Sequence, residues 1–113
     1  MNKFEEISKN RKKAHSKLLK LNSKVYRSFL EMEKVTYSEG YLSVKTKELI
    51  AVGISVVKDC ESCMQWHIQE AAKAGASLQE VLEAIEVGIE FGGGPATVSA
   101  RFALEVMESV FQE

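Results

Sequence analysis

Apolar residues recur along the chain at steps of three and four, the spacing that places side chains on one face of an α-helix. Residues 3–21 form the first such face. Its members are Phe4, Ile7, Ala14, Leu18 and Leu21. Asn22 and Ser23 favour helix N-caps, so they predict a break before a second helix over residues 25–34. Residues 35–42 are expected to form a loop.

A third predicted helix begins after Ser43 and ends near Val57. Its apolar residues lie nearly all round the helix, which is typical of a buried helix. Asp59 is the expected N-cap of a fourth helix over residues 60–74. Gly75 follows this helix, where a C′ glycine would end it.

Two more helices complete the pattern. Ser77 and Glu80 have the spacing of a capping box and begin the fifth helix. A run of three glycines ends that helix, and Pro95 suits the first turn of the sixth. We therefore predict an all-α fold of about six helices in a single domain, residues 1–113, with N-terminal helices over 1–39 and a motif-bearing core over 40–113.

Charge and composition narrow the classes of partner. The net charge is −1, from 15 Lys and Arg against 16 Asp and Glu, so we expect no nucleic acid partner. The first 24 residues are locally basic, which we interpret as the solvated face of an amphipathic helix. No apolar run is long enough to span a membrane, and the N-terminus lacks the apolar region of a signal peptide. A cytoplasmic protein without a membrane partner is expected.

The chemistry of the chain is concentrated between residues 60 and 67. Cys60 and Cys63 are three residues apart, and His67 follows four residues later. On a helix these side chains share one face, and the cysteine Cα atoms lie about 5–6 Å apart, within reach of a disulfide. The helix N-terminus favours thiolate, most strongly at Cys60, and His67 can exchange a proton near neutral pH.

This group of residues also has two other interpretations. Free cysteines are often inert core residues, and a lone histidine is often merely hydrogen-bonded. Cys60, Cys63 and His67 with one more ligand would also suit zinc, although a single CxxC with one histidine is a weak zinc signal. In a cytosolic chain, a thiol pair at a helix start favours redox chemistry, and we expect no metal.

With Glu48 added, these residues resemble the carboxymuconolactone decarboxylase superfamily and, within it, the alkylhydroperoxidase D-like proteins. That group has a glutamate, then CxxC, then a histidine four residues after the second cysteine, and the spacing here matches it. The flanking residues match the family as well, namely residues 42–51, Ala74-Gly75-Ala76 and Gly92-Gly93-Gly94-Pro95. The best-studied members carry a second histidine between the cysteines, where this chain has Ser62.

The resemblance implies a homo-oligomer, a trimer or a hexamer, that reduces peroxides or exchanges disulfides without a bound cofactor. The substrate would be a peroxide or a disulfide, and a thiol protein would donate the electrons. Cys63 would attack the peroxide and Cys60 would resolve the sulfenic acid, with Glu48 and His67 as the proton relay. Position on the helix alone predicts Cys60, not Cys63, as the nucleophile. We follow the family, since His67 lies one turn from Cys63.

The sequence leaves two alternative functions open. One is a lyase of the decarboxylase type without redox chemistry, and the other is a non-enzymatic oligomer that senses oxidation. The role of Glu48 depends on the backbone, because an unbroken helix would place Glu48 away from the cysteine face. A break at Lys58 and Asp59 is expected, and it must fold the third helix back against the fourth. Gly53 and Gly88 lie inside predicted helices, where we expect close helix packing.

Overall fold

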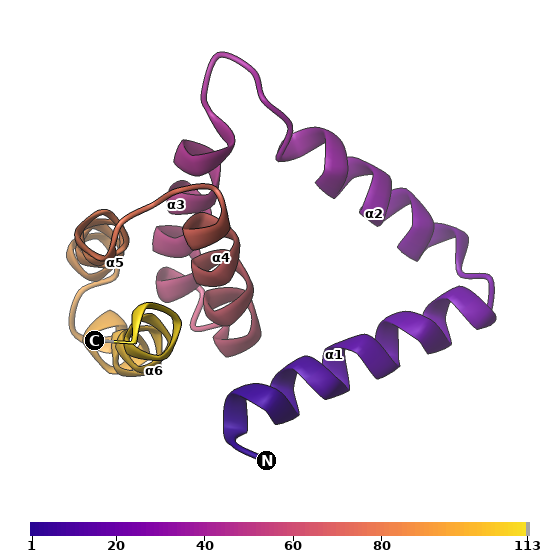
Figure 1. Ribbon diagram of the computed structural model, residues 1–113, viewed down its shortest axis with the longest axis horizontal. Coiled ribbons are helices and arrows are strands. Elements are labelled where there is room, and N and C mark those ends of the chain that lie inside the picture. Colours follow the sequence, from indigo (N-terminus) through magenta and orange to yellow (C-terminus); the bar gives the residue numbers. More distant parts are fainter. Residues whose placement is uncertain (113) are drawn as a thin grey trace. The chain divides into compact units, whose positions relative to one another are not determined.

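The computed structural model describes residues 1–112, and these form six helices joined by short turns, with no strand among them (Figure 1). The helices are α1 (Lys3–Lys20), α2 (Lys24–Thr36), α3 (Val44–Val57), α4 (Glu61–Lys73), α5 (Leu78–Gly92) and α6 (Gly94–Phe111). The predicted all-α fold of six helices is confirmed. The chain divides into two compact units after Ser38. That residues 1–113 act as a single domain stays a prediction.

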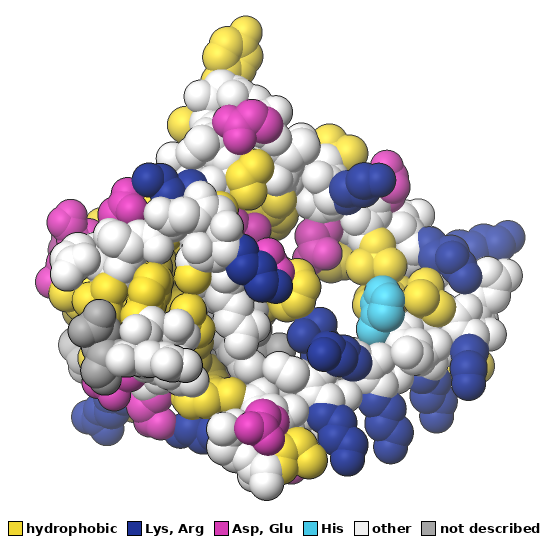
Figure 2. Space-filling view, in the orientation of Figure 1, with side chains coloured by type: hydrophobic (Ala, Val, Ile, Leu, Met, Phe, Trp, Pro, Cys, Tyr) yellow, Lys and Arg dark blue, Asp and Glu magenta, His cyan; other side chains and the backbone are white. Residues whose placement is uncertain are grey.

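The N-terminal unit consists of α1 and α2, and neither helix contains a buried residue. Asn2 caps α1 and Ser23 caps α2, while His15 and Tyr26 are hydrogen-bonded across the two helices. One face of α2 carries exposed apolar side chains: Val25, Phe29, Met32 and Val35. Residues 1–38 contain ten Lys and Arg against four Glu, and the basic side chains gather over these helices (Figure 2).

The C-terminal unit is built around α3, which packs against both α4 and α5, while α6 packs against α4 and α5 (Figure 1). Its core is apolar, because the apolar face of each helix points inward. The largest fully buried side chains are Met64, Ile68, Ile85, Val52, Val56, Val81 and Val106. This packing holds α3 and α4 side by side along their lengths, and that arrangement positions the candidate site.

Close packing of α3 against α5 explains two helical glycines. A Cβ atom on Gly88 would lie 2.7 Å from the backbone oxygen of Gly53, and one on Gly53 would lie 3.1 Å from the backbone oxygen of Ala84. Any side chain here would push the helices apart, because backbone atoms cannot rotate away as a flexible side chain can. The prediction of close helix packing at both glycines is confirmed.

Three helices end in the same way, with a left-handed residue at C′ and the two hydrogen bonds of a Schellman motif. The left-handed residues are Asn22, Asp59 and Gly75. After α3, the Asp59 amide donates to the Val56 carbonyl and the Cys60 amide donates to the Ser55 carbonyl. The expected break at Lys58 and Asp59 is confirmed, as is Gly75 at C′ of α4.

Asp59 is not the N-cap of α4, and that prediction is wrong. The cap is Cys60, whose backbone is extended, and α4 begins at Glu61. Asp59 has φ 53°, outside the extended region that an N-cap residue adopts, and its side chain accepts a hydrogen bond from Ser99. The remaining caps agree with expectation: Ser43 caps α3, and Ser77 with Glu80 forms the capping box of α5.

The outer face of α3 is exposed, so the expectation of a helix buried all round is wrong for the single chain. Ile50 and Ile54 are each about half exposed, at 48% and 57%. Together with α5 they line an apolar groove of about 640 Å³, whose other large apolar residues include Leu49, Val57, Val87 and Phe91. The buried face of α3 is the opposite one, which packs against α4 and α5.

The described residues include no helix that is both long and apolar enough to cross a membrane.

Candidate thiol redox centre

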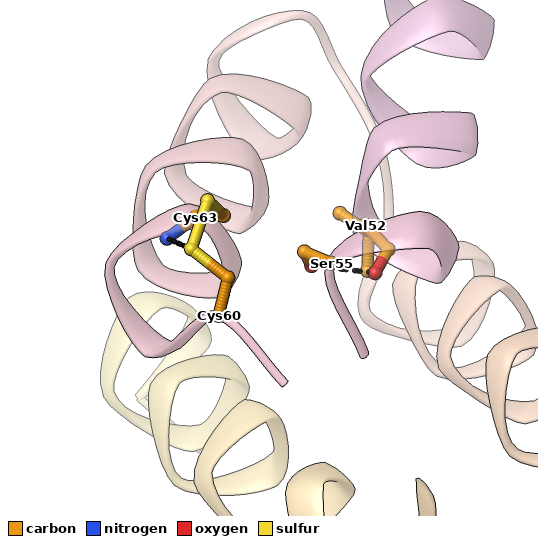
Figure 3. The surroundings of a disulfide bond; sticks show 4 residues. All are labelled: Val52, Ser55, Cys60 and Cys63. Carbon is orange, nitrogen blue, oxygen red and sulfur yellow. Dashed lines mark hydrogen bonds between the residues drawn. A yellow bond between two sulfur atoms is a disulfide. The ribbon is translucent and has the colours of Figure 1, made fainter. Parts of the chain in front are cut away.

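Cys60 and Cys63 are joined by a disulfide at the start of α4, with Val52 and Ser55 of α3 opposite (Figure 3). Their Cα atoms are 5.2 Å apart, as the i, i+3 spacing predicts. Both residues are partly exposed. The pair therefore has the proximity that reversible thiol–disulfide chemistry requires.

Cys60 belongs to two local structures at once. Its backbone amide donates a hydrogen bond to the Ser55 carbonyl in the last turn of α3, and Cys60 is also the N-cap residue of α4. In that position its sulfur accepts a hydrogen bond from the Cys63 amide, with an N to S distance of 3.2 Å. When the disulfide is open, the same amide and the positive end of the helix dipole favour a thiolate at Cys60.

Glu48 and His67 form the second pair of the site. Glu48 lies in the first half of α3, and the turn at residues 58–60 folds α4 back so that His67 meets it. Nδ1 of His67 lies 2.7 Å from Oε1 of Glu48. When Glu48 is ionised it accepts this hydrogen bond, so the proton resides on Nδ1 and Nε2 is the nitrogen that acts as a base.

Burial makes this pair chemically significant. Glu48 is 5% exposed, and a carboxylate removed from water needs a hydrogen-bonded partner to stay ionised. Among the described residues, the buried polar side chains are Glu48, Ser55, Gln65 and Ser99, and all lie on the helices around the disulfide.

The structure brings together the residues predicted for the site in two contacts. Cys60 is bonded to Cys63, and Glu48 is hydrogen-bonded to His67. Cys63 and His67 lie one turn apart on α4 and share a face. Ser62, which stands where the resembled proteins have a histidine, is exposed on the first turn of the same helix.

Sequence reasoning missed a contact beside the thiols, namely the hydrogen bond from the Ser99 hydroxyl on α6 to the Asp59 carboxylate, 2.8 Å long. These residues are 40 positions apart. The only signal was a serine on the buried face of the sixth helix, which does not indicate its partner. Within residues 1–112, no three His, Cys, Asp or Glu side chains are grouped as metal ligands.

Comparison with known proteins finds relatives of this chain in sequence and in fold. A curated relative, uncharacterised protein 4 in the cox locus of Paracoccus denitrificans, is 36% identical over 83 residues, covering 74% of this chain and 75% of the relative. A solved carboxymuconolactone decarboxylase family protein from Legionella pneumophila is 33% identical, with a TM-score of 0.91 over 97% of this chain and 98% of that one.

A second solved member of that family, from Thermotoga maritima, is 26% identical, with a TM-score of 0.86 over 95% of this chain and 91% of that one. An involvement in antioxidative response has been suggested for it. The model of the carboxymuconolactone decarboxylase family itself matches residues 23–106, which include both helices of the thiol site and most of α6. By this match and by the shared fold, the chain belongs to the carboxymuconolactone decarboxylase family.

Proposed function

We propose that this chain is a thiol-dependent peroxidase and disulfide oxidoreductase. The observation that supports the proposal most strongly is the Cys60–Cys63 disulfide at a helix N-terminus, with His67 one turn further along α4 and hydrogen-bonded to the buried Glu48 of α3. A dithiol that closes within one turn of helix needs little rearrangement between its two redox states. The suggested antioxidative role of the Thermotoga protein is consistent with this chemistry.

The oxidative half of the cycle uses both cysteines. The Cys63 thiolate attacks one peroxide oxygen, the O–O bond breaks, and the other oxygen leaves as an alkoxide or hydroxide that takes up a proton. Cys63 is then a sulfenic acid. Cys60 attacks its sulfur, a disulfide forms, and water leaves with the hydroxyl group and one proton. One peroxide is reduced by two electrons for each disulfide formed.

The reductive half requires a second thiol protein as electron donor. The donor thiolate attacks Cys63, and Cys60 leaves as a thiolate that the Cys63 amide stabilises. A second donor thiol then attacks the mixed disulfide and frees Cys63. The cycle needs no bound cofactor, and it needs a compartment that supplies reducing thiols, so we propose a cytoplasmic location.

Glu48 and His67 serve as the proton relay. His67 takes the Cys63 thiol proton on Nε2, and Glu48 stabilises the resulting imidazolium through the Nδ1 hydrogen bond. The same proton can then be delivered to the leaving oxygen. Ser62 cannot carry a proton near neutral pH as a second histidine would, so the relay in this chain has a single histidine.

Single-turnover chemistry tests these roles. Reduced protein is treated with one equivalent of peroxide, and its thiols are then counted by alkylation. We expect the wild type to lose both thiols, Cys60→Ser to accumulate a sulfenic acid on Cys63, and Cys63→Ser to remain unreacted. Wild-type thiols that persist would contradict the proposal, and so would a lyase activity that survives in Cys63→Ser.

We also propose that the groove between α3 and α5 is covered by a second copy of this chain. Exposed apolar groups lie together there, including Ile54, Val87 and Phe91, an arrangement typical of an interaction site. Charge supports a second copy as the partner. Residues 1–38 have ten basic residues against four acidic ones, whereas residues 39–113 have five basic residues against twelve acidic ones. Two copies therefore attract one another through unlike units.

A trimer or hexamer is the assembly that the family resemblance implies. Sedimentation of wild type and of Ile54→Glu measures it, with Glu86→Gln as a surface control that leaves the groove unchanged. We expect an oligomeric wild type and control, and a smaller species for Ile54→Glu. A monomeric wild type at micromolar concentration would refute the proposed interface.

A further inference from the structure

The residue before the redox pair has an uncommon backbone conformation. Asp59 has φ 53°, in the left-handed region, which glycine adopts more readily than any L-residue. Gly75 occupies the equivalent C′ position after α4. An aspartate therefore stands where a glycine would be easier to accommodate, immediately before Cys60.

A long-range hydrogen bond accounts for an aspartate at this position. The Ser99 hydroxyl donates to Oδ1 of Asp59 over 2.8 Å, and Ser99 is 9% exposed within α6. The same hydroxyl lies 3.5 Å from the Pro95 carbonyl of its own helix, a weaker alternative acceptor. The turn between α3 and α4 is thus tied to α6, the last helix of the C-terminal unit, and glycine would lose that tie.

This tie and the disulfide restrain the same short segment. Asp59 fixes the turn from the α3 side, and the disulfide fixes Cys60 to α4. Two restraints on one segment act cooperatively, because each removes conformational freedom that the other would otherwise have to remove. The hydrogen bond therefore favours closure of the disulfide although it touches neither sulfur.

We propose that Asp59, held by Ser99, is a positioning residue that keeps Cys60 within reach of Cys63 and thereby strengthens the disulfide. The inference rests on the proposed thiol chemistry, and it adds to that chemistry the determinant of how easily the site is reduced. Its effect lies in the thiol–disulfide equilibrium, which is independent of any peroxide.

Equilibration of the full-length protein with reduced and oxidised glutathione measures this equilibrium directly. Two thiols of the protein and one oxidised glutathione give the protein disulfide and two reduced glutathiones. Ser99→Ala removes the donor, and Asp59→Gly removes the acceptor while keeping a left-handed residue. Asp59→Asn is the matched control, because it keeps both an acceptor oxygen and tolerance of positive φ while it removes the charge.

We expect the equilibrium constant for disulfide formation to fall about three- to tenfold in Ser99→Ala and in Asp59→Gly, the range of one hydrogen bond. Asp59→Asn, whose neutral oxygen still accepts this hydrogen bond, should lose less than either of them. Far-UV circular dichroism checks that each variant is folded, and the two variants break the same bond from opposite ends. Unchanged equilibria in both would overturn the proposal, as would a shift in Asp59→Asn with none in Ser99→Ala. A protein that equilibrates normally but fails to consume peroxide would refute only the proposed function.

Discussion

Replacing Glu48 by glutamine separates the chemical role of this carboxylate from its structural role. In the wild type, Nδ1 of His67 lies 2.7 Å from Oε1 of Glu48. Glutamine has the same shape as glutamate and keeps an oxygen that can accept this hydrogen bond. What it lacks is the negative charge that stabilises a protonated imidazole. The substitution therefore leaves the contact in place and weakens the base.

The expected magnitudes differ for stability and for rate. A hydrogen bond to a charged group contributes about 1.5–3 kcal/mol and a neutral one about 0.5–1.5 kcal/mol. Burying an amide in place of a carboxylate at a site only 5% exposed offsets part of this difference, since the charge no longer has to be desolvated. We expect the free energy of unfolding to change by about 1 kcal/mol or less. General-base catalysis is typically worth 10²–10⁴-fold, so kcat/KM for peroxide should fall at least about a hundredfold.

The assay is peroxide consumption with a dithiol reductant, paired with urea unfolding of the same preparations. Glu86→Gln is the matched control, because it makes the same chemical change at an exposed carboxylate of α5. The control should match the wild type in both measurements. If Glu48→Gln kept kcat/KM within about twofold of wild type, the relay assigned to Glu48 and His67 would be wrong. A loss of several kcal/mol of stability would instead show that the carboxylate is mainly structural.

Two further predictions concern the scaffold. Gly88→Ala should lower the free energy of unfolding in urea by about 1–2 kcal/mol, since overpacking against the Gly53 backbone outweighs the helix propensity gained. Gly40→Ala is the control, because a Cβ atom there makes only ordinary contact, and its free energy of unfolding should stay within about 0.5 kcal/mol of the wild type. Equal stabilities of the two variants would contradict the close helix contact. Hydrogen bonds from the Ser77 backbone and from Lys45 hold the pKa of Glu80 below its usual range. The ionised carboxylate therefore stabilises the folded state at any pH above the ordinary pKa of a glutamate. This contribution is lost as the pH falls through the lowered pKa. Glu80→Gln should therefore be less stable than wild type at neutral pH and equal to it in acid, and a difference that is constant with pH in urea unfolding would refute the assignment.

Local signals in the sequence were sufficient for the helices and most of their ends. Ser77 with Glu80 predicted a capping box, and Gly75 predicted a C′ residue, because both depend on neighbours within one turn. Asp59 shows the limit of such reasoning. Aspartate is favoured both as an N-cap and in left-handed turns, and its side chain bonds Ser99, 40 residues away, a contact that no local pattern indicates.

The candidate site was predictable to the extent that it lies on one helix. Spacing alone placed Cys60, Cys63 and His67 together, since they fall within two turns of α4. Placing Glu48 in the site required knowing that the chain turns back after α3. Helical periodicity does not show this, and Glu48 was assigned from the family resemblance. The exposed face of α3 was missed for a related reason: an apolar pattern shows that a face avoids water, but not whether its own chain covers it.

Steady-state peroxide consumption with a dithiol reductant, on wild type and on Cys63→Ser, tests the central claim most directly. We predict that the wild type consumes peroxide in proportion to reductant oxidised, that an alkylation trap taken during turnover contains the Cys60–Cys63 disulfide, and that Cys63→Ser does neither. A wild type whose two thiols stay reduced in peroxide, or a Cys63→Ser variant that turns over at the wild-type rate, would contradict the account.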